Sequence, residues 1–206
     1  MNSTLPRELF DRVDNAPDSE FYQLPRFVNH IDDATIDALT AYYERAIPES
    51  SSVLDLMSSW VSHLPPEREF DRVSGLGMNQ AELAANPRLD EYAVHDLNAD
   101  PGLPFDEATF DFALIAVSIQ YLVRPLEVFE QVARVLRPGG SLIVAMSHRC
   151  FPTKAIRAFH AATMTQRAHL VAHYFDCVNQ FNQAEIVDCS PENADPLVIV
   201  RAAKVS

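Results

Sequence analysis

Residues 110–146 constrain the fold of this chain more than any other stretch of its sequence. Phe110–Ser118 is a continuous apolar run, which is typical of a central parallel strand buried on both faces. The next run, Leu126–Leu136, places its apolar residues at helical spacing along one stripe. Pro138–Gly140 then turns the chain into a second apolar run, Ser141–Met146. Strand, helix and strand in this order predict a parallel pair joined by a covering helix.

Weaker runs on both sides of this unit extend the same pattern. The further candidate strands are Val53–Leu56, Phe70–Gly75, Tyr92–His95, Ala184–Cys189 and Leu197–Ala202. The further candidate helices are Ile31–Ala46, capped by Asp32 or Asp33, Asn79–Asn86, capped by Asn79, and Thr163–Gln180. We therefore predict an α/β fold with a mostly parallel seven-stranded sheet, helices on both faces and an antiparallel C-terminal strand.

The stretch Ser52–Pro65 reads SVLDLMSSWVSHLP and predicts a strand, a turn and the start of a very short helix, which Pro65 and Pro66 end. This arrangement is how α/β proteins build a site for a nucleotide-like cofactor. Such turns normally carry glycines, and this one has none. The sequence therefore indicates a cofactor turn of unusual composition.

The first 50 residues are predicted to form a helical extension or lid, and residues 51–206 the main domain. The segment FYQLPRFVNHIDD, residues 21–33, is apolar and aromatic but interrupted by Pro25. It could lie across a pocket as a lid, or it could simply pack against the domain. Both alternatives stay open at this point.

Charge and composition narrow the function classes. The chain carries 29 acidic and 16 basic residues, a formal charge of −13, and its basic residues are dispersed singly. Nucleic-acid binding depends mainly on clustered Lys and Arg, so we expect a small-molecule substrate instead. No apolar run approaches the ~20 residues of a membrane span, and no signal peptide is recognisable. The three scattered cysteines indicate reduced thiols in a cytoplasmic protein. We expect a monomer or homodimer.

The segment from Leu103 to Ser147 carries a recognisable set of motifs. These are Leu103-Pro104-Phe105, Phe110-Asp111 and, in residues 134–140, RVLRPGG, followed by a strand. With this set, the chain from Val53 to Lys204 resembles the class I S-adenosylmethionine-dependent methyltransferases, in particular the type 11 methyltransferases. The resemblance implies a Rossmann-like methyltransferase fold, S-adenosylmethionine as cofactor and transfer of a methyl group to a small molecule.

The resemblance also implies which residues contact the cofactor. Asp55 falls at the end of the first strand, near the methionine amino group. Asp96 falls where an acid accepts a hydrogen bond from the adenine amino group, with Leu97 and Met78 as apolar neighbours of the ring. The expected cofactor site comprises Asp55, Ser58, Ser59, Gly75, Met78, Asn79, Asp96, Leu97 and Ser118.

Two features depart from the family pattern. Met57, Ser59 and Val61 stand where glycines are usual, and a non-glycine residue in a left-handed conformation costs about 1–2 kcal/mol. Ser59 could still cap a helix or donate to a carboxylate, while Trp60 could fill the cofactor cavity. Gly77 replaces the acid that grips both ribose hydroxyls, a loss of about 1.5–3 kcal/mol. Asn79 or Glu82 could reach the ribose instead.

Candidate catalytic residues follow the fourth and fifth predicted strands. His148 is the preferred base, Arg149 is available for an anionic substrate, and Tyr121 projects over the same edge. His30 and His63 are further histidines near this edge. His169 and His173 are four residues apart, but no third ligand is evident and we predict no metal site. Two alternatives remain: a non-catalytic partner or regulatory protein, and an enzyme of this fold with a different ligand.

Overall fold

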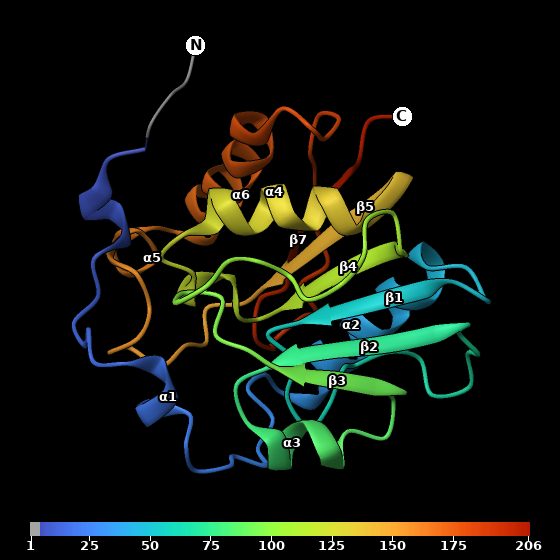
Figure 1. The fold of residues 1–206 in the computed structure, drawn as a ribbon. Coiled ribbons are helices and arrows are strands. Elements are labelled where there is room, and N and C mark those ends of the chain that lie inside the picture. The colour runs from blue at the N-terminus through green and yellow to red at the C-terminus, as the bar shows by residue number, and fades with distance from the viewer. Residues whose placement is uncertain (1–4) are drawn as a thin grey trace.

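Seven strands form one sheet in the order β3-β2-β1-β4-β5-β7-β6 in the computed structural model, which describes residues 5–206 (Figure 1). The strands are β1 (Ser52–Leu56), β2 (Arg72–Gly77), β3 (Glu91–Val94), β4 (Phe110–Ala116), β5 (Leu136–Met146), β6 (Glu185–Asp188) and β7 (Val198–Ala203). All pairs from β3 to β5 are parallel, whereas β7 runs antiparallel to both β5 and β6. The prediction of a mostly parallel sheet with one antiparallel C-terminal strand is confirmed.

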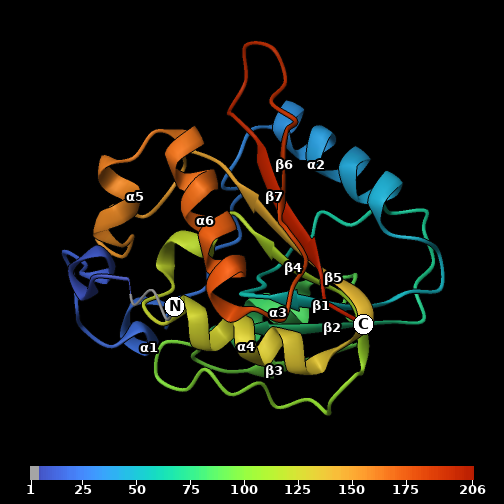
Figure 2. The same ribbon diagram turned by 90° about the horizontal axis from the view of Figure 1, so that it is seen from above.

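Helices cover both faces of this sheet. Figure 2 shows α2 (Asp33–Ala46) on one side and α4 (Pro125–Val135) with α6 (Met164–Val178) on the other. Each layer buries its own apolar cluster against the strands. The shorter helices are α1 (Asp18–Phe21), α3 (Gln80–Ala85) and α5 (Arg157–Ala161), and 3-10 turns occupy Arg7–Phe10 and Ile119–Tyr121. The architecture is the Rossmann-like arrangement that the sequence predicts.

Local capping signals place the helix starts. Asp32 accepts a hydrogen bond from the backbone of Thr35 at 2.9 Å and opens α2. Asn79 accepts from two backbone N–H groups of α3, and Thr163 opens α6 in a capping box. Because Asn179 adopts a left-handed conformation, with φ of 57°, α6 ends at Val178, before the predicted end at Gln180.

The connection between β1 and β2, residues 57–71, contains no helix, so the very short helix predicted after β1 was wrong. Met57 and His63 have φ values of 57° and 54°, which are incompatible with a right-handed helix. Pro65 and Pro66 remove two backbone donors from the same segment. The loop is instead held by Leu64, whose side chain is buried in the apolar cluster between α2 and the sheet.

The carboxyl ends of the parallel strands meet at one edge of the sheet. The N-terminal arm, as we name residues 11–31, passes along this edge, beside the arrowheads of β1, β2 and β3 in Figure 1. Two backbone hydrogen bonds tie the start of the arm to the segment after β5, from Asp14 to Thr153 and from Arg157 to Asp11. In open α/β sheets this edge is where ligands bind.

Candidate functional site

A cavity lies between the carboxyl ends of the strands and the N-terminal arm. Tyr22, Arg26, Val28 and His30 contribute the arm's side of its wall. The predicted residues that line it are Asp55, Ser58, Ser59, Met78, Asn79, Asp96, Leu97, Ser118 and Tyr121. The fold thus brings residues from four strand ends into one site.

Three predicted residues lie outside this wall. Gly75 is inside β2, where an added side chain would meet Leu89 rather than a ligand. His148, which is 50% exposed, and Arg149 both pair with the Asp195 carboxylate, at 3.3 and 3.5 Å. Arg149 lines a neighbouring depression that shares three residues with the cavity: His30, Tyr121 and Phe151. Their catalytic roles stay predictions, and the structure places both side chains beside the cavity rather than in its wall.

Asp55 is the buried centre of the loop that follows β1. The hydroxyls of Ser58 and Ser62 each donate to its Oδ2 atom at 2.6 Å. Asn86 in turn donates to the Ser62 hydroxyl at 2.9 Å and so fixes this serine. Burial raises the pKa of Asp55 to about 6, although the two serine hydrogen bonds oppose the shift.

This raised pKa predicts a specific pH dependence of stability. An acid whose folded pKa lies above its unfolded value of 3.8 binds more protons in the folded state between pH 4 and 6. Its contribution to stability therefore falls as pH rises through this window. Relative to Asp55→Asn, wild-type protein is expected to lose about 2–3 kcal/mol between pH 4 and pH 7. Urea unfolding of both proteins at several pH values measures the difference, and parallel pH profiles would contradict it.

The loop after Asp55 crosses directly over the end of β2. Met57 adopts the left-handed conformation that glycine usually supplies, and the Ser58 N–H donates to the Leu76 carbonyl at 2.8 Å. The Ser58 carbonyl oxygen then lies 2.2 Å from the point that a Cβ on Gly77 would occupy. The two departures from the family pattern are therefore one structural feature, since the loop occupies the space that an acid at position 77 would need.

The same loop is fastened to the N-terminal arm. The Ser59 hydroxyl donates to Glu82 Oε2 at 2.6 Å, so of the two alternatives for Ser59 it is a donor to a carboxylate. The Arg26 backbone N–H donates to the other oxygen, Glu82 Oε1, at 2.7 Å. The indole N–H of Trp60 donates to the Val28 carbonyl at 3.2 Å, and its ring meets Phe27 edge to face. Trp60 thus forms part of the wall, and a cavity remains beside it.

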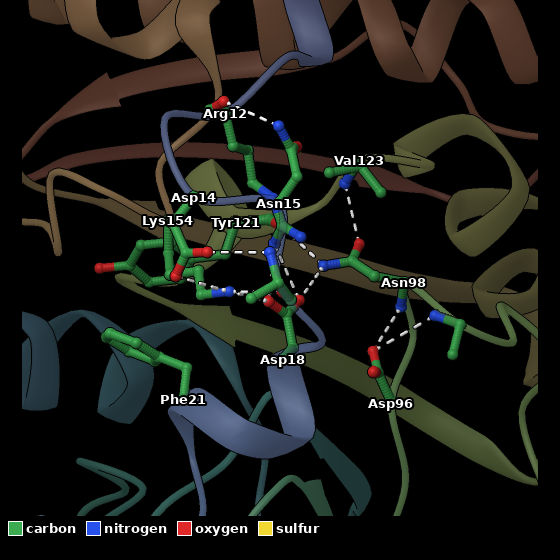
Figure 3. Close-up of polar contacts among 12 residues, drawn as sticks. Arg12, Asp14, Asn15, Asp18, Phe21, Asp96, Asn98, Tyr121, Val123 and Lys154 are labelled. Atoms are coloured by element: carbon green, nitrogen blue, oxygen red, sulfur yellow. Dashed lines mark hydrogen bonds and ion pairs between the residues drawn. The ribbon is translucent and has the colours of Figure 1, made fainter.

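Asp96 organises the opposite end of the cavity. Its Oδ1 atom accepts hydrogen bonds from the backbone N–H groups of Asn98 and Ala99 (Figure 3). The Asn98 side chain donates to Asp18 Oδ2 at 2.8 Å and to the Tyr121 carbonyl at 2.9 Å. The strand end is thereby linked to the arm.

An ion cluster that the sequence did not reveal secures the arm at this point. Asp18 pairs with Arg12 at 2.8 Å and with Lys154 at 3.1 Å, and Lys154 also pairs with Asp14 at 3.1 Å (Figure 3). The Lys154 side chain is completely buried. Burial opposes ionisation of Asp18, but hydrogen bonds from Arg12, Asn98 and Lys154 bring its pKa below the ordinary value. Lys154 lies more than a hundred residues from its partners in the sequence, so no local pattern could indicate the cluster.

Two fully buried polar side-chain atoms of cavity residues have no hydrogen-bond partner within residues 5–206. They are the buried Oγ of Ser118 and the buried Nδ1 of His63. Burial, with a smaller effect of His30, lowers the pKa of His63 to about 4, so its imidazole is neutral near pH 7. Because both residues line the cavity, these two atoms are candidates for hydrogen bonds to a ligand.

Comparison with known proteins agrees with this geometry. The family model described as "Methyltransferase domain" matches residues 58–144. A ubiquinone/menaquinone biosynthesis C-methyltransferase (UbiE) from Roseobacter denitrificans is 40% identical over 68 residues, which cover 33% of this chain and 26% of that protein. The match therefore spans about a quarter of the relative's length.

Solved structures show the same fold at low sequence identity. A phosphoethanolamine N-methyltransferase 2 from Haemonchus contortus, in complex with S-adenosyl-L-methionine, superposes with a TM-score of 0.59 at 16% identity, over 82% of this chain and 52% of that one. An S-adenosylmethionine-dependent methyltransferase from Mesorhizobium loti gives a TM-score of 0.57 at 16% identity, over 82% of this chain and 100% of that one. No helix within residues 5–206 is long and apolar enough to cross a membrane.

Proposed function

Because the chain belongs to the class I S-adenosylmethionine-dependent methyltransferase superfamily, we propose that it is an enzyme that transfers a methyl group from S-adenosylmethionine to a small molecule. The observation that carries this proposal is the arm-covered cavity at the strand ends, with Asp55 at one strand end and Asp96 at another. A net charge of −13 supports a small-molecule acceptor over a nucleic acid. We further propose a cytoplasmic monomer or homodimer in which the N-terminal arm serves as a lid over the cavity, whereas α2 is part of the main domain, because it packs against one face of the sheet.

The residues present fit this cofactor at both ends. Within residues 5–206, Asp55 Oδ1 and Asp96 Oδ2 accept no hydrogen bond, so both carboxylates have capacity for a ligand. Asp55 would face the ammonium group and Asp96 the adenine amino group, with Leu97 and Met78 as apolar neighbours. The Asn79 amide is committed to the α3 cap and to the carbonyls of residues 22 and 23. Each Glu82 oxygen accepts one hydrogen bond, from Arg26 or from Ser59, and keeps a second lone pair with which Glu82 would accept a ribose hydroxyl.

The bound cofactor supplies an electrophilic methyl group, and the protein's own residues position the acceptor and exclude water. The arm and Trp60 form the side of the cavity wall that faces the strand ends. An acceptor that carries a proton on its nucleophilic atom needs a base. His63 is one candidate, because it lines the cavity and has an unpartnered Nδ1, but the burial that lowers its pKa to about 4 also makes it a weak base. His148, held by Asp195 outside the wall, is the second candidate.

Calorimetry with S-adenosylmethionine and S-adenosylhomocysteine tests the proposal. Both are expected to bind, and Asp96→Asn is expected to weaken binding about tenfold, since it loses a charge-assisted hydrogen bond but keeps the cap acceptor. Asp100→Asn is the matched control, because Asp100 caps the Gly102 N–H outside the cavity. If neither ligand binds to the wild type at millimolar concentration, the proposed function is wrong.

One observation favours a second candidate function, an enzyme of this fold that uses a different ligand. The Ser58 carbonyl over Gly77 removes the position at which the family grips the ribose. Mass spectrometry of the small molecules that co-purify with the protein separates the two candidates. S-adenosylmethionine or S-adenosylhomocysteine supports the first, and another bound molecule supports the second.

A further inference from the structure

Arg26 presents the only guanidinium in the cavity wall among the described residues. It belongs to none of the ion pairs found within residues 5–206. Its Nη2 donates to the Phe21 carbonyl at 2.8 Å, and its Cζ lies 4.5 Å from the Phe21 ring centroid and 5.4 Å from that of Phe151. A half-buried cation is thus fixed in place by carbonyls and rings, without a compensating anion.

The carboxylates nearby are engaged with other groups. Asp18 is compensated by Arg12 and Lys154. Glu82 accepts the backbone N–H of Arg26, together with the Ser59 hydroxyl, and does not pair with the guanidinium. Desolvating a charge without an ionic partner costs free energy, and side chains in that state at a cavity wall are suited to a ligand of opposite charge.

We propose that Arg26 binds a carboxylate group of the ligands that occupy this cavity. A guanidinium offers a planar pair of donors that matches a carboxylate, and the surrounding rings fix its orientation in advance. The loop after β1 strengthens the case, because the Ser58 N–H is already bound to the Leu76 carbonyl and cannot serve an anion. The arm therefore supplies a binding residue as well as a cover.

This inference rests on the proposed function, under which a carboxylate can come from two sources. One is the amino-acid part of the cofactor, and the other is an anionic methyl acceptor. The two sources are distinguished by ligand pairs that differ in the carboxylate. For the cofactor, the affinity for S-adenosylhomocysteine is compared with the affinity for 5′-methylthioadenosine, which lacks the amino-acid part. For the acceptor, the affinity for benzoate is compared with that for benzamide, and both are titrated into protein saturated with S-adenosylhomocysteine.

Binding is measured by calorimetry for wild type, Arg26→Gln and the control Arg201→Gln, whose arginine forms an exposed ion pair with Glu185 between β7 and β6, outside the cavity wall. If Arg26 binds the cofactor's carboxylate, Arg26→Gln lowers the affinity for S-adenosylhomocysteine about ten- to a hundredfold and leaves the affinity for methylthioadenosine unchanged. If Arg26 binds the acceptor's carboxylate, the affinity for benzoate falls by that factor, while the affinities for benzamide and S-adenosylhomocysteine are unchanged. Arg201→Gln changes none of these affinities, and Arg26→Lys restores part of the loss.

A purely structural role for Arg26 would lower the melting temperature and weaken both members of each ligand pair equally. That result, or unchanged affinity for every ligand, overturns the inference. If the wild type binds neither nucleoside, the proposed function fails instead. The benzoate and benzamide arm, run without S-adenosylhomocysteine, then still decides whether Arg26 holds a carboxylate.

Discussion

Replacing Lys154 by methionine is expected to lower the free energy of unfolding by about 3 kcal/mol or more. Methionine has a similar length, so the packing changes little, but the charge balance of the cluster is lost. Arg12 and Lys154 balance Asp14 and Asp18, and the substitution leaves one negative charge in excess around a carboxylate that is only 6% exposed. It also removes the donor to the Ala16 carbonyl.

Thermal and urea unfolding measure this effect, with an expected fall in the melting temperature of about 6–12 °C for a domain of this size. Arg124→Ala is the control, because its ion pair with Glu127 is exposed and screened by solvent, so removing it should lower the melting temperature far less than Lys154→Met does. Equal losses in the two variants would show that the buried cluster contributes no more than an ordinary surface pair. The arm should also become more sensitive to proteases in Lys154→Met, because Asp14, Ala16 and Asp18 all bind this lysine.

Gly77→Ala is expected to destabilise the protein by about 2–3 kcal/mol and to weaken cofactor binding at least tenfold. The new methyl group would lie 2.2 Å from the Ser58 carbonyl oxygen, which belongs to the backbone and cannot rotate away. The loop must therefore move, and it carries Ser58 and Ser59 of the cavity wall with it. Calorimetry with S-adenosylhomocysteine and urea unfolding measure the two losses.

Gly75→Ala provides a matched control in the same strand. Its Cβ would approach the Leu89 Cδ1 atom to 2.4 Å, but this atom ends a flexible side chain that can rotate. We expect a cost of about 1 kcal/mol and little change in ligand affinity. Gly77→Asp, which would recreate the family's acid, should bind more weakly than wild type. Tighter binding by Gly77→Asp would show that the loop yields and that the position is still open.

The apolar runs between residues 53 and 202 were sufficient to predict the sheet, because strand burial and turn formation there depend on local composition. Asn79 and Asp32 were also predictable as caps, since a cap bonds only to the next few residues. The helix after β1 was predicted wrongly. The stretch has residues that a helix tolerates, but Ser58 and Ser62 bind Asp55 and the backbone turns left-handed at Met57.

The candidate site also contains residues that the sequence predicted and residues that only the structure revealed. Asp55, Met78, Asp96 and Leu97 were predicted because the family resemblance places each at or just after the end of a strand, and all four line the cavity. Arg26 was missed and His63 was left without a role, because the first belongs to an irregular arm and the second to an irregular loop. His148 had a suitable place in the sequence, but Asp195, from the segment between β6 and β7, holds it outside the cavity wall.

Apolar periodicity and turn residues act over a few neighbours, so the sequence was sufficient to predict the sheet and its crossover helices. The motifs of residues 103–147 carried the family resemblance, and the composition of residues 57–61 marked the unusual loop. The role of that loop depends on tertiary contacts, because its contacts with Gly77, Glu82 and Val28 join segments that are distant in the chain. Those contacts bring the arm over the cavity and place the Arg26 guanidinium in its wall.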